Sequence, residues 1–463
     1  MEDAATTKKL ITIMEKVLTC LLICLPILLC QKRTPIVQLD DGSKVQGAVG
    51  NAQDGKFVSE YLGIPYAQPP VGDRRFEVPL PTEPWHHILN ATSMPKSCYQ
   101  MLENGKNVID MTNSRPDIYE LSEDCLYLNI WVPQTLSSHP LPVTFYVHGG
   151  SFVKGSSAQN VHNGKFLAAE MDTIVVTFNY RLAVFGFFYT GIHEYPANMG
   201  IRDQIEAFRW VVKNIRAFGG DPEKITLVGN SAGAASVGFL STIPDIQSKV
   251  SRMIMYSGVP NAPWASHDRY KALSASMRLV KQVNCTRDMI MSTMAINCLK
   301  TIDPSVLVKY STGEGGSLSW TWKPVVDEHI VKLDQVISNN RSIDILIGTT
   351  SNEAGSFVGR MLSEKPNRLP SDALKFILRQ EIKKLFPDVH VPAGYFDEIF
   401  QTVMHLYGPP NNGEFNYTYF VSALNNIASD YLFNCPADRF AKHHVKHGHT
   451  VYKYVFDHMV STK

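Results

Sequence analysis

Short apolar runs rich in β-branched and aromatic residues recur along this chain and alternate with longer amphipathic stretches. Runs of this length between turn-forming residues are typical of buried strands. Segment 203–217 instead repeats its apolar residues at helical spacing, through Ile205, Phe208, Val212 and Ile215. It predicts a helix that ends at a turn over 218–222. The predicted strands are 144–147, 173–178, 225–228, 253–256, 343–347 and 451–456.

The alternation of predicted strands and helices indicates the α/β class, a mainly parallel sheet flanked by helices. No internal repeat, low-complexity tract or Pro/Ser-rich linker divides the chain. We therefore expect one domain over residues 31–463, long enough to bury a single large core.

The first thirty residues have the pattern of a secretory signal peptide. Lys8, Lys9 and Lys16 precede an apolar run over 17–30, which Pro26 interrupts. A run of this length is shorter than the roughly 20 residues that span a bilayer. We expect a signal peptide over residues 1–30, with Met14 as an alternative start, and hence a secreted protein. The alternative is an uncleaved segment that anchors the chain in a membrane.

Charge excludes some classes of partner. The chain has 44 basic and 43 acidic residues, a formal net charge of +1. It therefore has no overall excess of positive charge of the kind that binds nucleic acid, and we expect a small-molecule substrate. The sequence predicts no cofactor and no metal ion, and it leaves the oligomeric state open.

Five of the eight cysteines follow the predicted signal peptide. In a secreted chain these thiols are expected to pair. Cys98 with Cys125, and Cys285 with Cys298, would close two modest loops. Cys435 then remains, as an intermolecular link, a free thiol, or the partner of a cysteine outside this sequence.

Four Asn-x-Ser/Thr tripeptides are candidate sites of N-glycosylation. Such tripeptides are common by chance, so they agree with secretion without establishing it. The four asparagines are Asn90, Asn284, Asn340 and Asn416.

A candidate nucleophile follows the predicted strand 225–228. Gly229, Ser231 and Gly233 form the pattern G-x-S-x-G, and small residues after it favour the start of a helix. At such an elbow a sharp strand-to-helix turn exposes the serine hydroxyl. We predict Ser231 as the nucleophile, against the alternative of an ordinary strand-helix turn.

A serine that attacks a carbonyl needs backbone N–H groups directed at the oxyanion that forms. Gly149 and Gly150 follow the predicted strand 144–147, and the N–H of Ala232 follows the nucleophile. We expect these three residues to form the oxyanion hole. The alternative for the glycine pair is a turn without a catalytic role.

The serine also needs a histidine base and a carboxylate that orients it, in the chain order serine, acid, histidine. Glu353 follows the predicted strand 343–347 and is the candidate acid, with a solvated loop carboxylate as the alternative. Only His458 follows the last predicted strand, directly at its end. The other histidines after Glu353 precede that strand: His390, His405, His443, His444, His447 and His449.

Several motifs in order resemble the type-B carboxylesterases and cholinesterases over nearly the whole mature chain. They are Gly63-Ile64-Pro65-Tyr66-Ala67, Pro69-Pro70-Val71-Gly72, Ser122-Glu123-Asp124-Cys125-Leu126-Tyr127-Leu128-Asn129-Ile130, Phe178-Asn179-Tyr180-Arg181, Asp203-Gln204, Phe218-Gly219-Gly220-Asp221-Pro222 and the serine elbow.

The resemblance implies an α/β-hydrolase fold and a Ser-Glu-His triad with Ser231 and Glu353. It also implies the oxyanion hole of Gly149, Gly150 and Ala232, and the same two disulfides. By the same resemblance the catalytic histidine and the partner of Cys435 would follow Lys463. We therefore expect a carboxylesterase domain that is incomplete at its C-terminus.

Within the family, Pro260-Asn261-Ala262-Pro263-Trp264-Ala265 favours the cholinesterase branch. Arg115 stands where the resemblance implies a choline-binding tryptophan, and Asn230 replaces an acid beside the nucleophile. Leu318 and Trp320 would narrow the acyl pocket. We expect a general short-chain carboxylesterase rather than an acetylcholinesterase. A catalytically inactive, esterase-like binding or adhesion protein is the second alternative.

Overall fold

The computed structural model describes most of the chain after the predicted signal peptide. The described residues are 32–100, 120–135, 137–288, 290–311, 321–327, 329–333, 342–362, 369–385, 395–409, 413 and 415–458.

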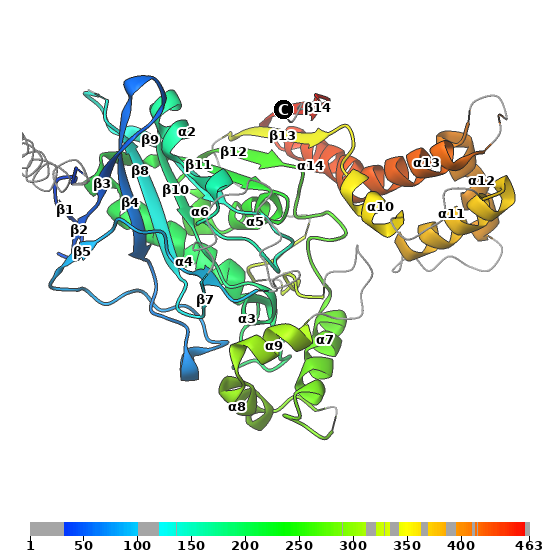
Figure 1. Ribbon diagram of the computed structural model, residues 1–463, viewed down its shortest axis with the longest axis horizontal. Helices are drawn as coiled ribbons and strands as arrows, with labels where there is room; N and C mark the ends of the chain where they lie inside the picture. Colours follow the sequence, from blue (N-terminus) through cyan, green and yellow to red (C-terminus); the bar gives the residue numbers. More distant parts are fainter. Residues whose placement is uncertain are drawn as a thin grey trace, which may run out of the picture.

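A nine-stranded sheet forms the centre of the molecule (Figure 1). Its strand order is β14-β13-β12-β11-β9-β10-β8-β4-β3; the first six strands are parallel, and β8, β4 and β3 add antiparallel pairs at one side. The strands are β3 (Ala48–Asn51), β4 (Phe57–Pro65), β8 (Tyr127–Pro133), β9 (Leu141–Val147), β10 (Ile174–Phe178), β11 (Gly220–Asn230), β12 (Val250–Tyr256), β13 (Asp344–Thr350) and β14 (Thr450–Phe456). Short strands outside it are β1 (Val37–Gln38), β2 (Lys44–Gln46), β5 (Ile88–Asn90), β6 (Ser97–Cys98) and β7 (Leu121–Ser122).

All six predicted strands are present, as β9 to β14, and the predicted α/β class is confirmed. The predicted helix is α4 (Met199–Asn214), which the 3-10 turn η5 (Ile215–Phe218) extends. The predicted turn at 218–222 is shorter than expected, because Gly220 already pairs with Leu141 and the register shifts before Ile225. The strand therefore begins with a bulge that the run 225–228 does not reveal.

Alternating side chains of the strands face two separate cores. Ile130 and Val176 belong to the main hydrophobic cluster, whereas their neighbours Trp131 and Val175 pack in a smaller cluster with helix α2 (Lys165–Met171). Successive strand residues point to opposite faces. Helix α2 thus covers one face, and α4 and α5 (Ala232–Leu240) lie in the main cluster on the other.

Helices α7 to α13 form two groups beside the sheet (Figure 1). Helices α7 to α9 lie on the side of α3 that faces away from the sheet. Helices α10 to α13 extend from the side of the sheet that carries β13. Helices of the described residues, besides α2, α4 and α5, are α3 (Ala183–Phe187), α6 (Pro244–Gln247), α7 (Arg269–Gln282), α8 (Thr293–Thr301), α9 (Pro304–Ser311), α10 (Gly355–Leu362), α11 (Ser371–Leu385), α12 (Tyr395–Tyr407), α13 (Tyr417–Ser429) and α14 (Cys435–Lys446). Short turns are η1 (Gln53–Gly55), η2 (Gly72–Arg74), η4 (Asn160–His162) and the π-helical η7 (Asp430–Asn434).

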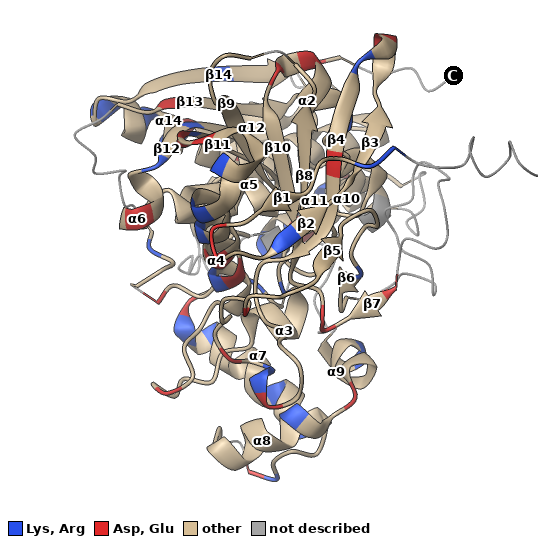
Figure 2. Ribbon diagram, turned by 90° about the vertical axis from the view of Figure 1, so that its left-hand side faces the viewer, with Lys and Arg blue, Asp and Glu red and all other residues tan. Residues whose placement is uncertain are grey.

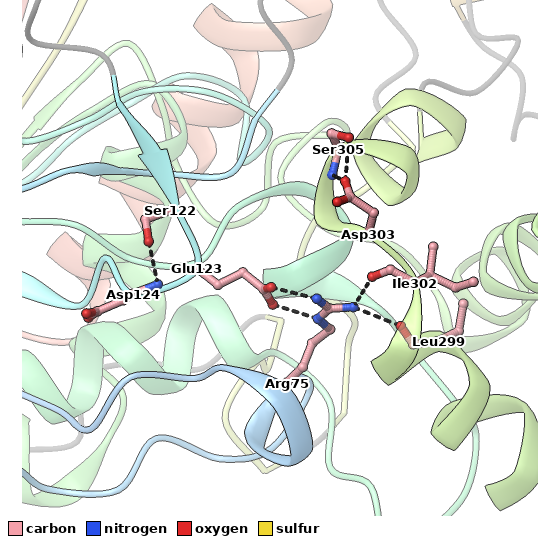
Figure 3. A network of polar contacts seen from close by, with 8 residues as sticks. All are labelled: Arg75, Ser122, Glu123, Asp124, Leu299, Ile302, Asp303 and Ser305. Carbon is pink, nitrogen blue, oxygen red and sulfur yellow. Dashed lines mark hydrogen bonds and ion pairs between the residues drawn. The ribbon is translucent and has the colours of Figure 1, made fainter.

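A buried arginine connects the α8–α9 group to the loop before β8 (Figure 3). Arg75 donates two hydrogen bonds of 2.6 Å to the carboxylate of Glu123. The remaining guanidinium nitrogen of Arg75, Nη1, donates to the carbonyls of Leu299 and Ile302 at the end of α8. Removal of Arg75 would take this donor from the Glu123 carboxylate and the Ile302 carbonyl, whereas the Leu299 carbonyl keeps the N–H of Ile302. The arginine thus fixes helices α8 and α9 on the core.

Figure 2 shows Lys and Arg residues interspersed with Asp and Glu residues along α4. This agrees with the near-zero net charge. In the described part of the chain, no helix is long and apolar enough to cross a membrane.

Candidate active site

Ser231 lies at a sharp turn between β11 and α5. Its φ of 55° and ψ of −120° are unusual for a residue with a side chain. A methyl group on Gly229 would lie 2.3 Å from the carbonyl oxygen of Gly233, and one on Gly233 would lie 2.1 Å from that of Val147. The turn therefore requires glycine on both sides of the serine, as the elbow pattern predicts.

Gly149 lies directly beside this serine. A methyl group on Gly149 would lie 3.4 Å from the Cβ atom of Ser231 and 2.7 Å from the backbone oxygen of Asn230. Ala232 is the first residue of α5, so its N–H is among those that no carbonyl within the helix accepts. The structure thus brings Gly149, Ser231 and Ala232 together.

Two hydrogen bonds fix the peptide groups of the glycine loop. The hydroxyl of Tyr180 donates to the carbonyl of His148 over 2.9 Å, and this peptide carries the N–H of Gly149. The Nδ1 atom of His148 donates to the carbonyl of Gly149 over 2.8 Å, and that peptide carries the N–H of Gly150. Both candidate oxyanion donors therefore belong to peptide planes that a buried side chain orients.

His148 itself is a neutral group. Burial, with a smaller contribution from His162, lowers the pKa of His148 to about 3. Its ring stacks on Tyr180 with a centroid separation of 4.4 Å. A buried imidazole with this pKa positions the glycine loop and does not accept a proton near neutral pH.

Two further side chains, neither of them among the predicted site residues, bond the backbone of the loop that follows Gly150. Gln100 donates to the carbonyl of Gly155 over 2.9 Å and accepts from its N–H over 2.8 Å. The side chain of Asn179 accepts from the N–H of Ser157 over 2.8 Å. Asn179 and Tyr180 belong to a family motif quoted above, which was the available signal for them. Cys98-Tyr99-Gln100 resembles the cholinesterase branch of the family, but that resemblance did not indicate this contact of Gln100.

A buried ion pair anchors the same motif to α4. Arg181 donates to both carboxylate oxygens of Asp203 over 2.8 and 2.6 Å, and the two side chains are 3% and 0% exposed. The N–H of Arg181 also donates to this carboxylate. The motif pair Arg181 and Asp203 therefore sets the position of the chain that carries Tyr180.

Glu353 lies just beyond the carboxyl end of β13. Its Oε1 atom accepts the N–H of Thr350 over 2.7 Å. Strands β11, β12 and β13 are parallel neighbours, so Ser231 and Glu353 follow the same edge of the sheet. Strands β11 and β13 themselves lie two strand spacings apart, about 10 Å along the sheet. Burial raises the pKa of Tyr454 on β14, and the nearby Tyr256 and Glu353 raise it further.

The histidines after Glu353 lie in different places. His458 follows β14 at the same edge of the sheet, is exposed, and has its ring 6.3 Å from that of Phe456. The histidines of α14 and the turn after it, namely His443, His444, His447 and His449, precede β14 and so lie towards its opposite end. His405 is on α12, and His390 lies outside the described residues.

Both predicted disulfides are present, Cys98 with Cys125 and Cys285 with Cys298. Among the described cysteines Cys435 is unpaired and exposed. Of the predicted glycosylation sites, Asn90, Asn284 and Asn416 are exposed. Asn340, the acyl-pocket residues Leu318 and Trp320, Arg115 and the signal peptide lie outside the described residues.

A family model described as the carboxylesterase family matches residues 33–463. The chain belongs to the carboxylesterase family. This membership establishes the α/β-hydrolase fold, and the chemistry of the family is the hydrolysis of carboxylic esters.

Curated relatives of this carboxylesterase-family chain include three acetylcholinesterases. The enzyme of Electrophorus electricus is 33% identical over 86% of this chain and 63% of its own length. Acetylcholinesterase 1 of Caenorhabditis elegans is 32% identical over 92% and 70%, and the acetylcholinesterase of Danio rerio is 35% identical over 87% and 64%. The chain thus spans between 63% and 70% of these relatives.

Proposed function

We propose that this protein hydrolyses short-chain carboxylic esters with Ser231 as nucleophile. The observation that carries the proposal is the contact of Gly149 with Ser231 at the strand-helix turn. Such a turn presents a hydroxyl and backbone N–H groups to the same carbonyl group. Family membership supports the same reaction class.

In this mechanism the Ser231 oxygen bonds the carbonyl carbon, and a base takes the hydroxyl proton. The N–H groups of Gly149, Gly150 and Ala232 stabilise the oxyanion, which then expels the alcohol together with that proton. Water hydrolyses the acyl-serine in a second round and releases the acid. Glu353 orients the base and stabilises its protonated form.

The base itself is assigned to none of the described histidines. The family resemblance implies a histidine after Lys463 as the base, and this stays a prediction. Among the histidines that the structure describes, His458 is the alternative candidate for the base, because it lies at the edge of the sheet that carries Ser231 and Glu353.

We propose a general carboxylesterase rather than an acetylcholinesterase. Asn230, an uncharged amide, is the neighbour of Ser231, and its Nδ2 atom donates to the carbonyl of Tyr256 over 3.4 Å. A quaternary ammonium substrate gains no attraction from this side chain. We also propose secretion, which the two disulfides support because such bonds persist in oxidising compartments.

The test is hydrolysis of 4-nitrophenyl acetate and butyrate by the secreted chain, beside Ser231→Ala and with acetylthiocholine as a third substrate. Hydrolysis that the variant abolishes, with poor use of acetylthiocholine, would support the proposal and identify a base within residues 1–463, so the prediction of a base after Lys463 would be wrong. Equal inactivity of two folded proteins would contradict ester hydrolysis by residues 1–463 alone. It would agree with a base after Lys463 or with the alternative of an esterase-like binding protein.

A further inference from the structure

The turn that carries the candidate acid Glu353 is bonded to a distant helix end. The N–H of Ala354, the next residue, donates to the hydroxyl oxygen of Ser429 over 3.0 Å, across 75 residues of sequence. Ala354 and Ser429 are 0% and 2% exposed, so this bond lies inside the protein. Ser429 is the last residue of α13. A side chain of α13 therefore holds the backbone on the C-terminal side of Glu353.

The carboxylate of Glu353 makes the second bond of this turn. Its Oε1 atom accepts the N–H of Thr350 over 2.7 Å, and Thr350 is the last residue of β13. The turn is thus fixed at one end by the strand and at the other by Ser429. Loss of the Ser429 hydroxyl would release the second end and let the carboxylate move away from its place.

Ser429 stands directly before the π-helical turn η7, which connects α13 to α14. Pro436 accounts for this wider turn. A proline has no N–H, and its ring clashes with the carbonyl four residues earlier, which here is that of Leu432. The wider turn relieves the clash, and the Leu432 carbonyl instead accepts the indole N–H of Trp264 over 2.9 Å. Single π turns within helices are frequent at functional sites.

Two neighbouring helices hold this π turn in place. Asp430 accepts the hydroxyl of Tyr407, on α12, over 2.9 Å. The ring of Phe433 stacks on that of Phe357, on α10, with a centroid separation of 6.4 Å. Helix α10 begins two residues after Glu353. The π turn is therefore tied to α12 and to the helix that follows the candidate acid.

We propose that Ser429 is a positioning residue for Glu353, and that the π turn at 430–434 sets the place of its hydroxyl. This inference rests on the proposed hydrolase function, in which Glu353 orients the base. The Ser429 hydroxyl acts through the N–H of Ala354 and not on the reacting atoms. A displaced carboxylate orients the base less well in the transition state, so its displacement lowers kcat and leaves binding of the ester unchanged.

The first test is the kinetics of 4-nitrophenyl butyrate hydrolysis by the full chain, Ser429→Ala, Glu353→Gln and the double variant. We expect Ser429→Ala to lower kcat about tenfold to 100-fold with KM unchanged, since a misplacement of about 1 Å costs up to about 100-fold. In the Glu353→Gln background the same change should have no further effect, because residues that act as a unit are not additive. Fully additive losses would overturn the proposal.

Ser311→Ala is the matched control. Ser311 is the last residue of α9, is 5% exposed, and donates its hydroxyl to the carbonyl of Val308 over 2.7 Å. Both serine changes should lower the midpoint of urea unfolding, because each removes a buried hydrogen bond. Only Ser429→Ala should lower kcat. If Ser311→Ala lowers kcat as much, lost stability explains the effect and Ser429 has no positioning role.

Hydrogen exchange of the Thr350 amide tests the proposal without hydrolysis. This amide donates to the Glu353 carboxylate, so it exchanges faster when the carboxylate leaves its place. Mass spectrometry at single-residue resolution should show exchange about fivefold to tenfold faster in Ser429→Ala, the protection that one such bond provides, and no change in Ser311→Ala. An inactive unaltered chain would count against the proposed function alone. Unchanged Thr350 exchange in Ser429→Ala would overturn the positioning role, whether or not the chain hydrolyses esters.

Discussion

The hydroxyl of Tyr180 donates a 2.9 Å hydrogen bond to the backbone carbonyl of His148. Both residues are buried, and the bonded peptide carries the N–H of Gly149 beside Ser231. The next peptide is held in turn by the His148 ring. The geometry of the candidate oxyanion hole is therefore set by two aromatic side chains behind it.

Tyr180→Phe removes the hydroxyl and leaves the His148 carbonyl without its donor. An unsatisfied buried acceptor costs about 1–3 kcal/mol, so the free energy of unfolding should fall by that amount in urea titrations. Tyr452→Phe is the control, because Tyr452 is 59% exposed and its change should cost under about 0.5 kcal/mol. Equal effects of the two changes would count against a structural role for the Tyr180 hydroxyl.

Gly149→Ala places a methyl group 2.7 Å from the Asn230 carbonyl, closer than the atoms tolerate. The loop must move away from Ser231, which removes an oxyanion donor from its position. Ester hydrolysis should fall about 100-fold in kcat, the effect of losing one such donor. Gly359→Ala serves as comparison, since nothing lies within 4 Å of a methyl group there. If both variants hydrolyse nitrophenyl butyrate normally, Gly149 has no part in the oxyanion hole.

Arg181→Met breaks a buried ion pair and leaves the Asp203 carboxylate uncompensated. We expect a loss of about 3–5 kcal/mol in the free energy of unfolding. Arg209→Met breaks the exposed pair with Asp245, whose side chains are 54% and 50% exposed, and should cost at most about 1 kcal/mol. Denaturant titration of both variants measures the contrast. A small effect at Arg181 would mean that the motif does not depend on this pair.

Two buried histidines should make the fold sensitive to acid. Burial lowers the pKa of His148 to about 3 and, as the main cause, that of His444 to about 4. As the pH falls, the unfolded chain binds these protons near pH 6.5, which is a higher pH than the folded chain requires. Stability is therefore fully present above pH 6.5 and falls as the pH drops towards 3–4, by up to about 1.4 kcal/mol per pH unit for each histidine. Thermal melts of the protein and of His444→Phe should differ in slope between pH 6.5 and 4, and parallel curves would refute the contribution of His444.

Strand β14 lies at the edge of the sheet and exposes Tyr452, Val455 and Phe456. An apolar edge strand invites pairing with another chain. Val455→Lys should reduce self-association, measured by light scattering at constant protein concentration. A separate contribution comes from the exposed thiol of Cys435, and Cys435→Ser should abolish any disulfide-linked dimer in non-reducing gels. Unchanged scattering with Val455→Lys would show that this edge does not drive association.

Local sequence was enough for the features that depend on neighbouring residues. The strands β9 to β14 follow from short β-rich runs between turn-forming residues, because such runs have the length of a strand and are too short for most helices. The elbow at Ser231 follows from its two glycines, because the backbone approaches of 2.3 and 2.1 Å leave no room for a side chain. The disulfide pairings followed from sequence-local spacing and agreed with the family resemblance.

Only the tertiary structure decided how distant segments meet. Gln100 lies 55 residues before Gly155 and bonds both its backbone groups, yet no periodicity links the two positions. The extension of β11 back to Gly220 depends on pairing with Leu141. The physical reason is that hydrogen bonds and packing between remote segments depend on the path of the whole chain, whereas turns and strands are determined by the residues beside them.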